Sequence, residues 1–502
     1  MSNFHKTLNR WCDNPFFPLV FLPLAALMLC LCTEATSPLF LNDGTDSAIF
    51  KSIGLGILKG KIPYVDIFDH KGPVIFFINA LGQWIHSGRP GIFLLEIISL
   101  SAALLVLFRT SRLYVDGCTA FLCTLVSLVF FGTLVTEGDQ CEEWELPFLC
   151  LSFYYALSHI AKGGEKAFPF KESAILGFCF AFVFLIRPND GVSIPGGIML
   201  YLTVASLLRK QYKGTLVSIA GFAAGAAVLS LPVFAYFLYH GAFFDLVNGT
   251  VLANASYAGG FKETLLSCLG HGKQSLALIF IALMCLAATV DRKSCYLLAL
   301  VSLLTFIFIG PRLYIHYHMV LIPSIGLMVT YMFLAKDKPL VVLSLAVLLL
   351  SPQAGTDGFL KMGRKAFQLR VQKILDGQKD IARLYEQTDR LIDIIPEEER
   401  DEIWNYNLDW DNKGKSTFSL LIHRNLVQSN IVTFGGNEEI KRRDDIRNHS
   451  PKWLLKDNRM TPLWERVYLL DPERLEYIDT HFDLVARTDT TVCDVALYRW
   501  KD

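Results

Sequence analysis

The stretch YVDIFDHKGPVIFFINALGQWIH, residues 64–86, decides the fold of this chain. It begins with four charged or titratable side chains in six positions, namely Asp66, Asp69, His70 and Lys71. The apolar run that follows, 74–86, is only 13 residues long, whereas a helix needs about 20 to cross a bilayer. Because Asn79, Gln83 and His86 recur on one helical face, we expect 74–86 to lie along a membrane interface rather than to cross it.

The composition of the chain is that of a polytopic membrane protein. Of its 502 residues 52% are hydrophobic and 19% are charged, with a mean hydropathy of +0.38, and the apolar residues fall in long blocks. The formal net charge is zero, which gives no general reason to expect a nucleic-acid partner. About eleven windows are apolar enough to span, with the shortest ones borderline: 15–35, 91–108, 114–135, 146–160, 173–187, 190–208, 215–239, 274–290, 295–310, 318–334 and 339–351.

The positions of lysine and arginine predict the orientation. If the N-terminus is cytoplasmic and 74–86 does not cross, every inner loop carries at least two basic residues, as the positive-inside rule requires. These are Arg109 and Arg112; Lys162, Lys166 and Lys171; Arg209, Lys210 and Lys213; Arg292 and Lys293; and Lys336 and Lys338. Counting 74–86 as a span would reverse every later loop. The sequence therefore predicts a multi-pass protein of the plasma (inner) membrane with a cytoplasmic N-terminus.

Cysteine usage points to neither a disulfide framework nor a zinc motif. The chain has 12 cysteines, most of them inside apolar blocks, and no CxxC pair. The basic N-terminus and the apolar run after it resemble a signal peptide without a clear cleavage site, so we interpret them as an uncleaved first span.

The composition becomes that of a soluble protein near residue 353. We expect a transmembrane domain over 1–352 and a small extracytoplasmic α/β domain over 353–502. A helical pattern covers 361–394 and ends before Pro396. Further elements are expected as strands at 430–434, 464–470 and 492–500, with a polar helical stretch at 437–448 between them.

The first outer loop carries the first candidate for chemistry, Asp46. A second interfacial helix is expected from Ser47 to Lys59, with Gly60 as its stop. Asp46 would lie at the beginning of that helix, where a helix N-cap and a functional carboxylate are compatible roles. Asp43, in the sequence NDG, is better explained as a turn residue.

The second candidate group is the charge cluster that opens the interfacial segment. Asp66 fits a turn carboxylate. Asp69, His70 and Lys71 lie at the expected lipid headgroup level, where a cation is placed to bind a phosphate. The alternative for Lys71 is a side chain that extends to lipid headgroups.

Later outer loops add acids, an arginine and two histidines. Glu142 and Glu143 stand at the outer end of a span, where they form either a solvated loop or part of a site. Arg187 ends an apolar helix on the outer side, where the positive-inside rule disfavours it, so it needs an anionic partner. Three further candidates share the segment RLYIHYH with interfacial tyrosines: Arg312, His316 and His318.

These segments resemble, in their order, landmarks of the GT-C superfamily of polyprenyl-phosphate-sugar-dependent glycosyltransferases. The resemblance is to bacterial family 39-like enzymes, relatives of protein O-mannosyltransferases and of the lipid A aminoarabinose transferase, and it covers roughly 15–350. The segments are TDSAIF (45–50), FDHKGP (68–73), EGDQCEEWELPF (137–148), IRPND (186–190) and RLYIHYH (312–318). The family's acidic motif often has two adjacent carboxylates, whereas Ser47 follows Asp46 here.

The resemblance implies a mainly α fold and an inverting transfer of a sugar from a polyprenyl-phosphate donor on the extracytoplasmic face. Asp46 would act as the base, with Glu142 or Glu143 as its partner carboxylate. Five cationic or titratable side chains would bind the donor phosphate: Lys71, His70, Arg187, Arg312 and His316. Asp69 and His318 are further candidates. The acceptor would be a polysaccharide, lipid or protein. No cofactor is firmly implied; a divalent metal is compatible with the carboxylates but has no motif.

Two functions of other classes remain open on the sequence alone. A transporter or flippase of lipid-linked sugars would need charged residues at mid-membrane depth and broken helices in repeated halves, and neither pattern is evident. A non-catalytic membrane scaffold would leave the placement of Lys71, Arg187 and His316 without explanation.

Overall fold

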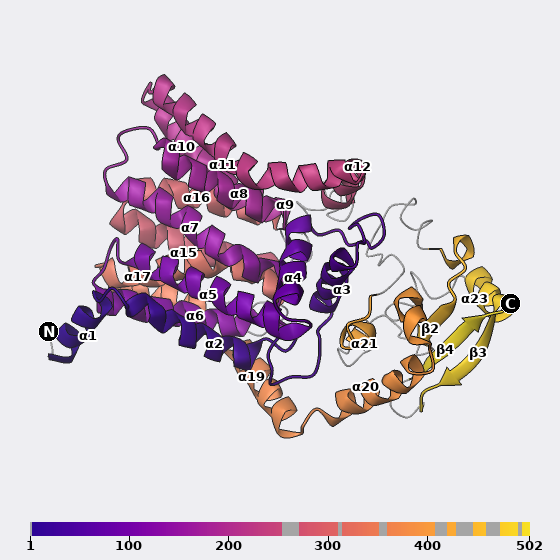
Figure 1. The fold of residues 1–502 in the computed structure, drawn as a ribbon. Helices are drawn as coiled ribbons and strands as arrows, with labels where there is room; N and C mark the ends of the chain where they lie inside the picture. The colour runs from indigo at the N-terminus through magenta and orange to yellow at the C-terminus, as the bar shows by residue number, and fades with distance from the viewer. Residues whose placement is uncertain are drawn as a thin grey trace.

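The computed structural model describes residues 3–253, 271–309, 314–350, 359–406, 419–427, 445–457, 472–489 and 494–501. A bundle of apolar helices carries two short helices and a C-terminal α/β portion at one end (Figure 1). The N-terminal helix α1 (Asn3–Cys12) lies at the opposite end of the bundle.

Most helices of the bundle overlap the apolar windows of the sequence, whereas α12 (Phe243–Val247) lies outside all of them. Their bounds are α2 (Phe21–Cys32), α5 (Arg89–Ser111), α6 (Gly117–Leu134), α7 (Cys141–Ala161), α8 (Phe170–Phe184), α9 (Pro188–Gly191), α10 (Gly197–Leu208), α11 (Tyr212–Tyr239), α12 (Phe243–Val247), α15 (His271–Val290), α16 (Arg292–Phe308), α17 (Ile322–Leu334) and α18 (Lys338–Leu350). By length and composition, five helical segments in the described part of the chain could each cross a membrane, or six if the pair bent by 100° at Cys12–Phe17 counts as one. The chain is a multi-pass membrane protein of mainly α fold.

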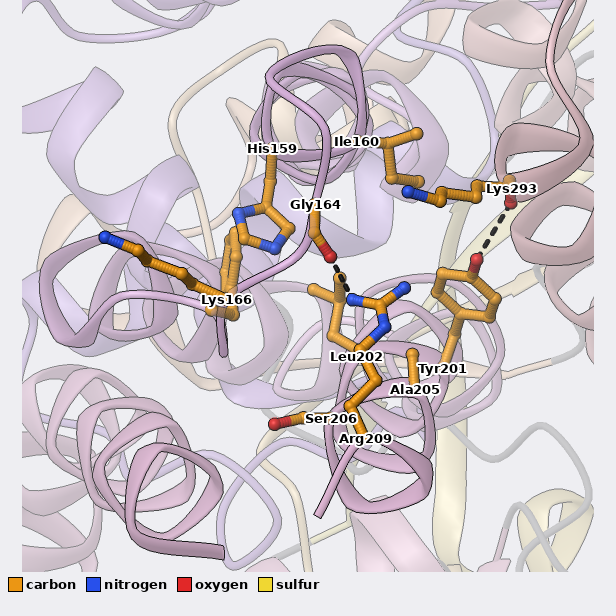
Figure 2. Close-up of a pocket in the computed structure, with 11 residues that line it drawn as sticks. His159, Ile160, Gly164, Lys166, Tyr201, Leu202, Ala205, Ser206, Arg209 and Lys293 are labelled. Carbon is orange, nitrogen blue, oxygen red and sulfur yellow. Dashed lines mark hydrogen bonds between the residues drawn. The ribbon is translucent and has the colours of Figure 1, made fainter. Parts of the chain in front are cut away.

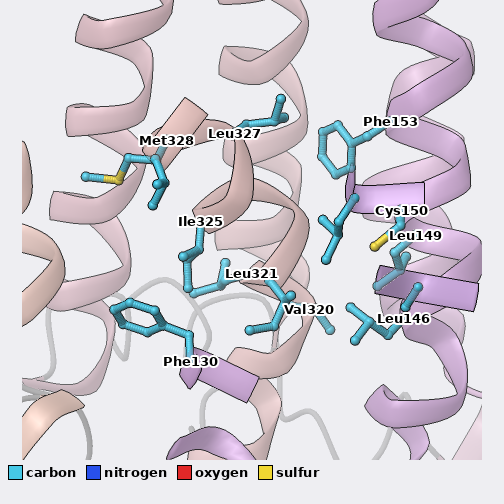
Figure 3. Packing of buried hydrophobic residues seen from close by; sticks show 14 of the residues in the cluster. Phe130, Leu146, Leu149, Cys150, Phe153, Val320, Leu321, Ile325, Leu327 and Met328 are labelled. Carbon is cyan, nitrogen blue, oxygen red and sulfur yellow. The ribbon is translucent and has the colours of Figure 1, made fainter. Parts of the chain in front are cut away.

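Close packing between α7 and the 3₁₀ segment Ile315–Leu321 forms the centre of the bundle (Figure 3). Leu146, Leu149 and Phe153 on α7 face Val320 and Leu321, and all five are at most 1% exposed. His316 and Tyr317 belong to the same 3₁₀ segment. This apolar contact therefore also fixes the position of these two polar residues along α7.

Two short helices cover one end of the bundle. They are α3 (Asp46–Leu58) and α4 (Pro73–Ile85). They cross closely because Gly54 has no side chain; a Cβ there would lie 2.7 Å from the Ala80 nitrogen. Gly60, at a φ of +85°, follows the end of α3. The expected helix 47–59 is therefore confirmed within one residue, except that Thr45 occupies the N-cap position and Asp46 is the first helical residue.

The C-terminal portion contains a four-stranded sheet of order β1-β2-β4-β3. Its elements are β1 (Ile403–Tyr406), β2 (Trp453–Asp457), β3 (Phe482–Arg487), β4 (Val495–Trp500), α21 (Ser419–Ile422) and α23 (Pro472–His481). β1 and β2 pair in parallel, and the other two pairs are antiparallel. The expected strand at 492–500 corresponds to β4, whereas 430–434 and 464–470 lie outside the described residues, as does most of 437–448.

The expectation of one continuous helix over 361–394 was wrong. The chain forms α19 (Phe359–Leu375) and α20 (Lys379–Ile392), separated at Gly377 and Gln378, whose φ angles are +69° and +52°. Gly377 tolerates this left-handed backbone without strain, which is the usual way to end a helix.

The break between α19 and α20 holds the C-terminal portion against the loop between α2 and α3. The Gln378 side chain accepts a hydrogen bond from the Leu41 amide at 2.8 Å and donates to the Leu39 carbonyl at 3.0 Å. Lys373 forms an ion pair with Glu34 at 2.5 Å. The loop that leads to Asp46 is thus bonded to the tail on both sides of the helix break.

Asp43 is the centre of a buried ionic network in the same loop. Its Oδ1 lies 3.0 Å from Lys51 Nζ and 2.9 Å from Arg89 Nε, and the Tyr385 hydroxyl of α20 lies 3.3 Å from Oδ2. Burial alone would raise the pKa of the Asp43 carboxyl, but the charges of Lys51 and Arg89 lower it. Asp43 is therefore more than the turn residue that the sequence predicted.

Candidate functional site at the end of the bundle

The loop that carries Lys71 is joined to the end of α8 through the main chain. The Gly72 amide donates to the Ile186 carbonyl at 2.9 Å, and the Val74 amide donates to the Leu185 carbonyl at 3.1 Å. Only glycine fits at position 72, because a Cβ there would lie 2.1 Å from the Leu185 oxygen. Lys71 and Arg187 therefore come from segments whose backbones are in direct contact.

Lys71 lies in a compact cluster with its two sequence neighbours. Its Nζ is 3.0 Å from His70 Nε2, and its amide donates to Asp69 Oδ1 at 2.8 Å. Burial would lower the pKa of the Lys71 ammonium, but the carboxylates of Asp69 and Asp46 raise it. The pKa of His70 is well below its ordinary value because of burial and then of Lys71. The cluster thus offers one fixed cation and a neutral imidazole.

Arg187 is buried and paired, as expected of an arginine that follows an apolar helix. Its Nη1 contacts Glu142 Oε1 and lies 3.1 Å from Asp190 Oδ2. Its guanidinium carbon is 4.2 Å from the ring centroid of Tyr317, a cation–π distance. Glu142 is thereby an ion-pair partner of Arg187, whereas the sequence predicted Glu142 or Glu143 as the partner carboxylate of Asp46.

Asp46 and His316 belong to the same group of interacting charges. Asp46 interacts electrostatically with His70, Lys71 and His316, and His316 also interacts with Glu142 and Arg187. The structure therefore brings together six of the residues that the sequence singled out, from five separate segments: Asp46, His70, Lys71, Glu142, Arg187 and His316.

The second carboxylate beside Asp46 is Glu137, which the sequence analysis did not select. Glu137 Oε2 accepts a hydrogen bond from the Thr45 amide at 2.7 Å, at the beginning of α3. Burial, followed by the charge of Asp46, raises the pKa of Glu137 to about 7. A carboxyl group that titrates near neutrality next to another acid is typical of a functional site. Its sequence signal is weak: one acid before Gly138, in a loop with several acids.

Asp139 connects helices that lie next to Asp46. Its oxygens accept hydrogen bonds from Ser47 Oγ (2.8 Å), Trp144 Nε1 (2.8 Å) and Asn79 Nδ2 (3.1 Å), which belong to α3, α7 and α4. Its own amide donates to Glu96 Oε1 at 2.7 Å. Burial raises the pKa of Asp139 to about 6. Because it ties three helices together next to Asp46, we assign Asp139 a positioning role.

Two of the predicted residues do not belong to this group. Glu143 caps its own helix by accepting from the Gln140 amide at 3.4 Å and interacts with Glu96 and Asp139 rather than with Asp46. His318 is buried, with Nδ1 3.2 Å from the Ile315 carbonyl. Arg312 lies outside the described residues.

The group contains no metal-like arrangement within the described residues. No three of its histidine, cysteine or carboxylate side chains have ligand atoms that all lie within 4.8 Å of one another. The chemistry that it offers is cationic binding of an anion and proton acceptance by a carboxylate.

A separate pocket at the other end of α7 has a different character (Figure 2). It is lined by His159, Tyr201, Arg209 and Lys293 among others, and Arg209 donates to the Gly164 carbonyl. No carboxylate lines it. A helix the length of α7 (Cys141–Ala161) spans about 30 Å, so this pocket is remote from Glu142 and is not part of the candidate site.

Comparison with known proteins finds a family model that matches part of the chain and solved structures that share its fold. Residues 70–251 match the family described as dolichyl-phosphate-mannose-protein mannosyltransferase. The matched segment includes Lys71, Glu142 and Arg187. The resemblance to the GT-C superfamily predicted from the sequence is therefore confirmed.

Two solved structures have the same fold over nearly the whole chain. ArnT from Cupriavidus metallidurans bound to undecaprenyl phosphate has a TM-score of 0.60 at 12% identity, covering 95% of this chain and 97% of that one. Its apo state has a TM-score of 0.54 at the same identity and coverage. No curated protein sequence matches the chain.

Proposed function

We propose that this protein is a glycosyltransferase that moves a sugar from a polyprenyl-phosphate donor to an acceptor hydroxyl. The observation that carries the proposal is the convergence of Lys71, Arg187 and His316 with Asp46 at one end of an apolar bundle. Further support comes from the family match over 70–251 and from the undecaprenyl phosphate in the ArnT structure that shares the fold.

Lys71 and Arg187 would bind the donor phosphate. As the anomeric carbon is attacked, the phosphodiester leaves as a phosphate dianion, so negative charge grows between fixed cations. Cations held in place before the reaction stabilise the transition state more than the ground state. Arg187 is held by Glu142, Asp190 and the Tyr317 ring, and it keeps further N–H groups for a phosphate because guanidinium carries five.

Asp46 would accept the proton of the acceptor hydroxyl. A positioned base of this kind contributes roughly 10²–10⁴-fold to a rate. Glu137 would act as its partner carboxylate at the beginning of α3. A single direct displacement would invert the anomeric centre.

The short helices α3 and α4 would lie at the interface, so that the isoprenoid chain remains in lipid while its headgroup reaches the site. With the N-terminus cytoplasmic, as the basic loops predict, the site and the C-terminal portion would face the extracytoplasmic side of the plasma membrane. The acceptor would be a polysaccharide, lipid or protein hydroxyl.

The test is sugar release from a labelled polyprenyl-phosphate donor in liposomes that contain the purified protein. Asp46→Asn and Lys71→Ala should each lower turnover by at least 100-fold. Lys61→Ala and Glu172→Gln serve as charge-matched controls, because neither residue takes part in the group of charges, and both should stay near wild type. Near wild-type turnover in Asp46→Asn and Lys71→Ala would overturn the proposal, and donor movement across the bilayer without sugar release would favour a flippase.

A further inference from the structure

A second cluster of metal-ligating side chains lies at the end of the bundle opposite to the candidate site. It consists of His5 on α1 and of Asp116 and Cys118 at the turn between α5 and α6. One ligand atom from each residue lies within 4.8 Å of the other two. His5 Nε2 and Asp116 Oδ1 are 3.6 Å apart. Each residue is partly buried, which distinguishes the cluster from an ordinary exposed acidic group.

The fold holds the three side chains together through their neighbours. Asp116 is the N-cap of α6, and its oxygens accept from the amide and the hydroxyl of Thr119 at 3.2 and 2.9 Å. The Cys118 amide donates to Asn9 Oδ1 at 2.7 Å, and Asn9 Nδ2 lies 3.5 Å from His5 Nε2. Asn9 therefore contacts both His5 and Cys118.

Close approach of the backbone at Gly117 completes the arrangement. A Cβ at position 117 would lie 2.7 Å from the Cys12 Cβ, so the turn can reach α1 only with glycine there. The nearest guanidinium, that of Arg112, pairs with Asp13 at 2.9 Å. Because Arg112 pairs with Asp13, the Asp116 carboxylate stays in the cluster.

We propose that His5, Asp116 and Cys118 form a zinc site. An imidazole, a carboxylate and a thiolate are the three ligand types that zinc takes in proteins, at about 2.0–2.3 Å. Those bond lengths in a tetrahedron place ligand atoms roughly 3.3–3.8 Å apart, and the His5–Asp116 distance falls in that range. The Asp116 oxygens keep lone pairs for a metal besides those that cap α6.

Binding would release one proton to solvent, from the Cys118 thiol, as a zinc–sulfur bond forms. Water would fill the fourth position, since three protein ligands leave one open. The ion would fasten α1 to the α5–α6 turn. Because it binds only the folded protein, it would raise thermal stability as its concentration rises.

The experiment measures metal on the full-length protein in detergent, purified under reducing conditions and dialysed against zinc. Wild type should retain about one zinc per chain by elemental analysis. Replacing zinc with Co²⁺ should produce a thiolate-to-cobalt charge-transfer band in the near ultraviolet, which only a cysteine ligand generates. His5→Ala and Cys118→Ser should lose the bound zinc, and Cys118→Ser should abolish the band.

Matched controls separate this site from any other metal site. Asp13→Asn alters a neighbouring acid and Cys285→Ser alters an exposed thiol, and both should keep the zinc and the band. Melting temperatures without metal, equal to wild type, would show that the variants are folded. The proposal is overturned if wild type retains no zinc, or if His5→Ala and Cys118→Ser retain as much as wild type.

Discussion

The Gly72 amide donates its hydrogen bond to the Ile186 carbonyl, one residue before Arg187. The main chain thereby joins the two segments that carry the cations proposed to bind the donor phosphate. Cations placed in this way need little reorganisation when charge develops during a reaction. The contact requires glycine at position 72, so the addition of one methyl group by substitution with alanine tests it.

Gly72→Ala should reduce sugar transfer by at least 10-fold and also lower stability. The added Cβ would lie 2.1 Å from the Leu185 oxygen, so the Lys71 loop must move away from Arg187. Initial rates at saturating donor and the melting temperature in detergent measure the two effects.

Gly60→Ala is the matched control for that change. A Cβ at Gly60 meets nothing within 4 Å, although its φ of +85° makes alanine strained by about 1–2 kcal/mol. If Gly60→Ala impaired transfer as much as Gly72→Ala, loop strain in general would explain the loss.

Arg187→Lys should lower turnover by roughly 10²–10³-fold, the usual cost of losing one charge-stabilising donor. An ammonium cannot contact two carboxylates and an aromatic ring in the planar geometry that Arg187 adopts. Arg209→Lys, at the other end of the bundle, is the control and should leave turnover unchanged. Equal turnover in Arg187→Lys and wild type would exclude bidentate phosphate binding by this arginine.

The pH dependence of transfer should reveal Glu137. Its pKa is raised to about 7 by burial and by Asp46, so it is protonated below that pH and ionised above it. Because we expect only the ionised form of Glu137 to act as the partner carboxylate of Asp46, kcat/KM should rise as pH increases through about 7. Glu137→Gln should flatten this part of the profile, and an unchanged profile in that variant would show that another group titrates there.

Lys51→Met should destabilise the protein by about 3–5 kcal/mol, because it leaves the Asp43 charge buried with one partner fewer. Denaturation in detergent would measure the change. Arg383→Met removes an exposed ion pair with Asp489 and should cost at most about 1 kcal/mol. If Lys51→Met lost no more stability than this control, the contacts of Arg89 and Tyr385 would be enough to stabilise the buried Asp43 carboxylate without the lysine.

The sequence predicted the helical framework well because apolar blocks and basic loops are strong local signals. The apolar stretch 74–86 corresponds to α4, and Gly60 marked the end of α3. The division of 361–394 into two helices was missed because Gly377 and Gln378 interrupt the pattern without a proline, and one glycine inside a helical pattern is a weak stop signal.

The sequence predicted individual residues of the candidate site, but it did not predict which of them pair with one another. Lys71 and Arg187 stood out because each charge occupied an unusual position beside apolar sequence. The partners of these residues depended on tertiary contacts: Glu142 was selected as an acid near a helix end, but only the fold places it on Arg187 and Glu137 beside Asp46. Several acids occur within nine residues of that loop, and spacing along the chain does not indicate which of them faces α3.

The side chain of Gln378 bonds to the backbone on both sides of Phe40, six residues before Asp46. Any displacement of the tail is therefore passed directly to the segment that leads into α3. Replacing the tail with that of a relative that lacks this glutamine would therefore change more than the surface of the protein. It would also shift the proposed base, Asp46.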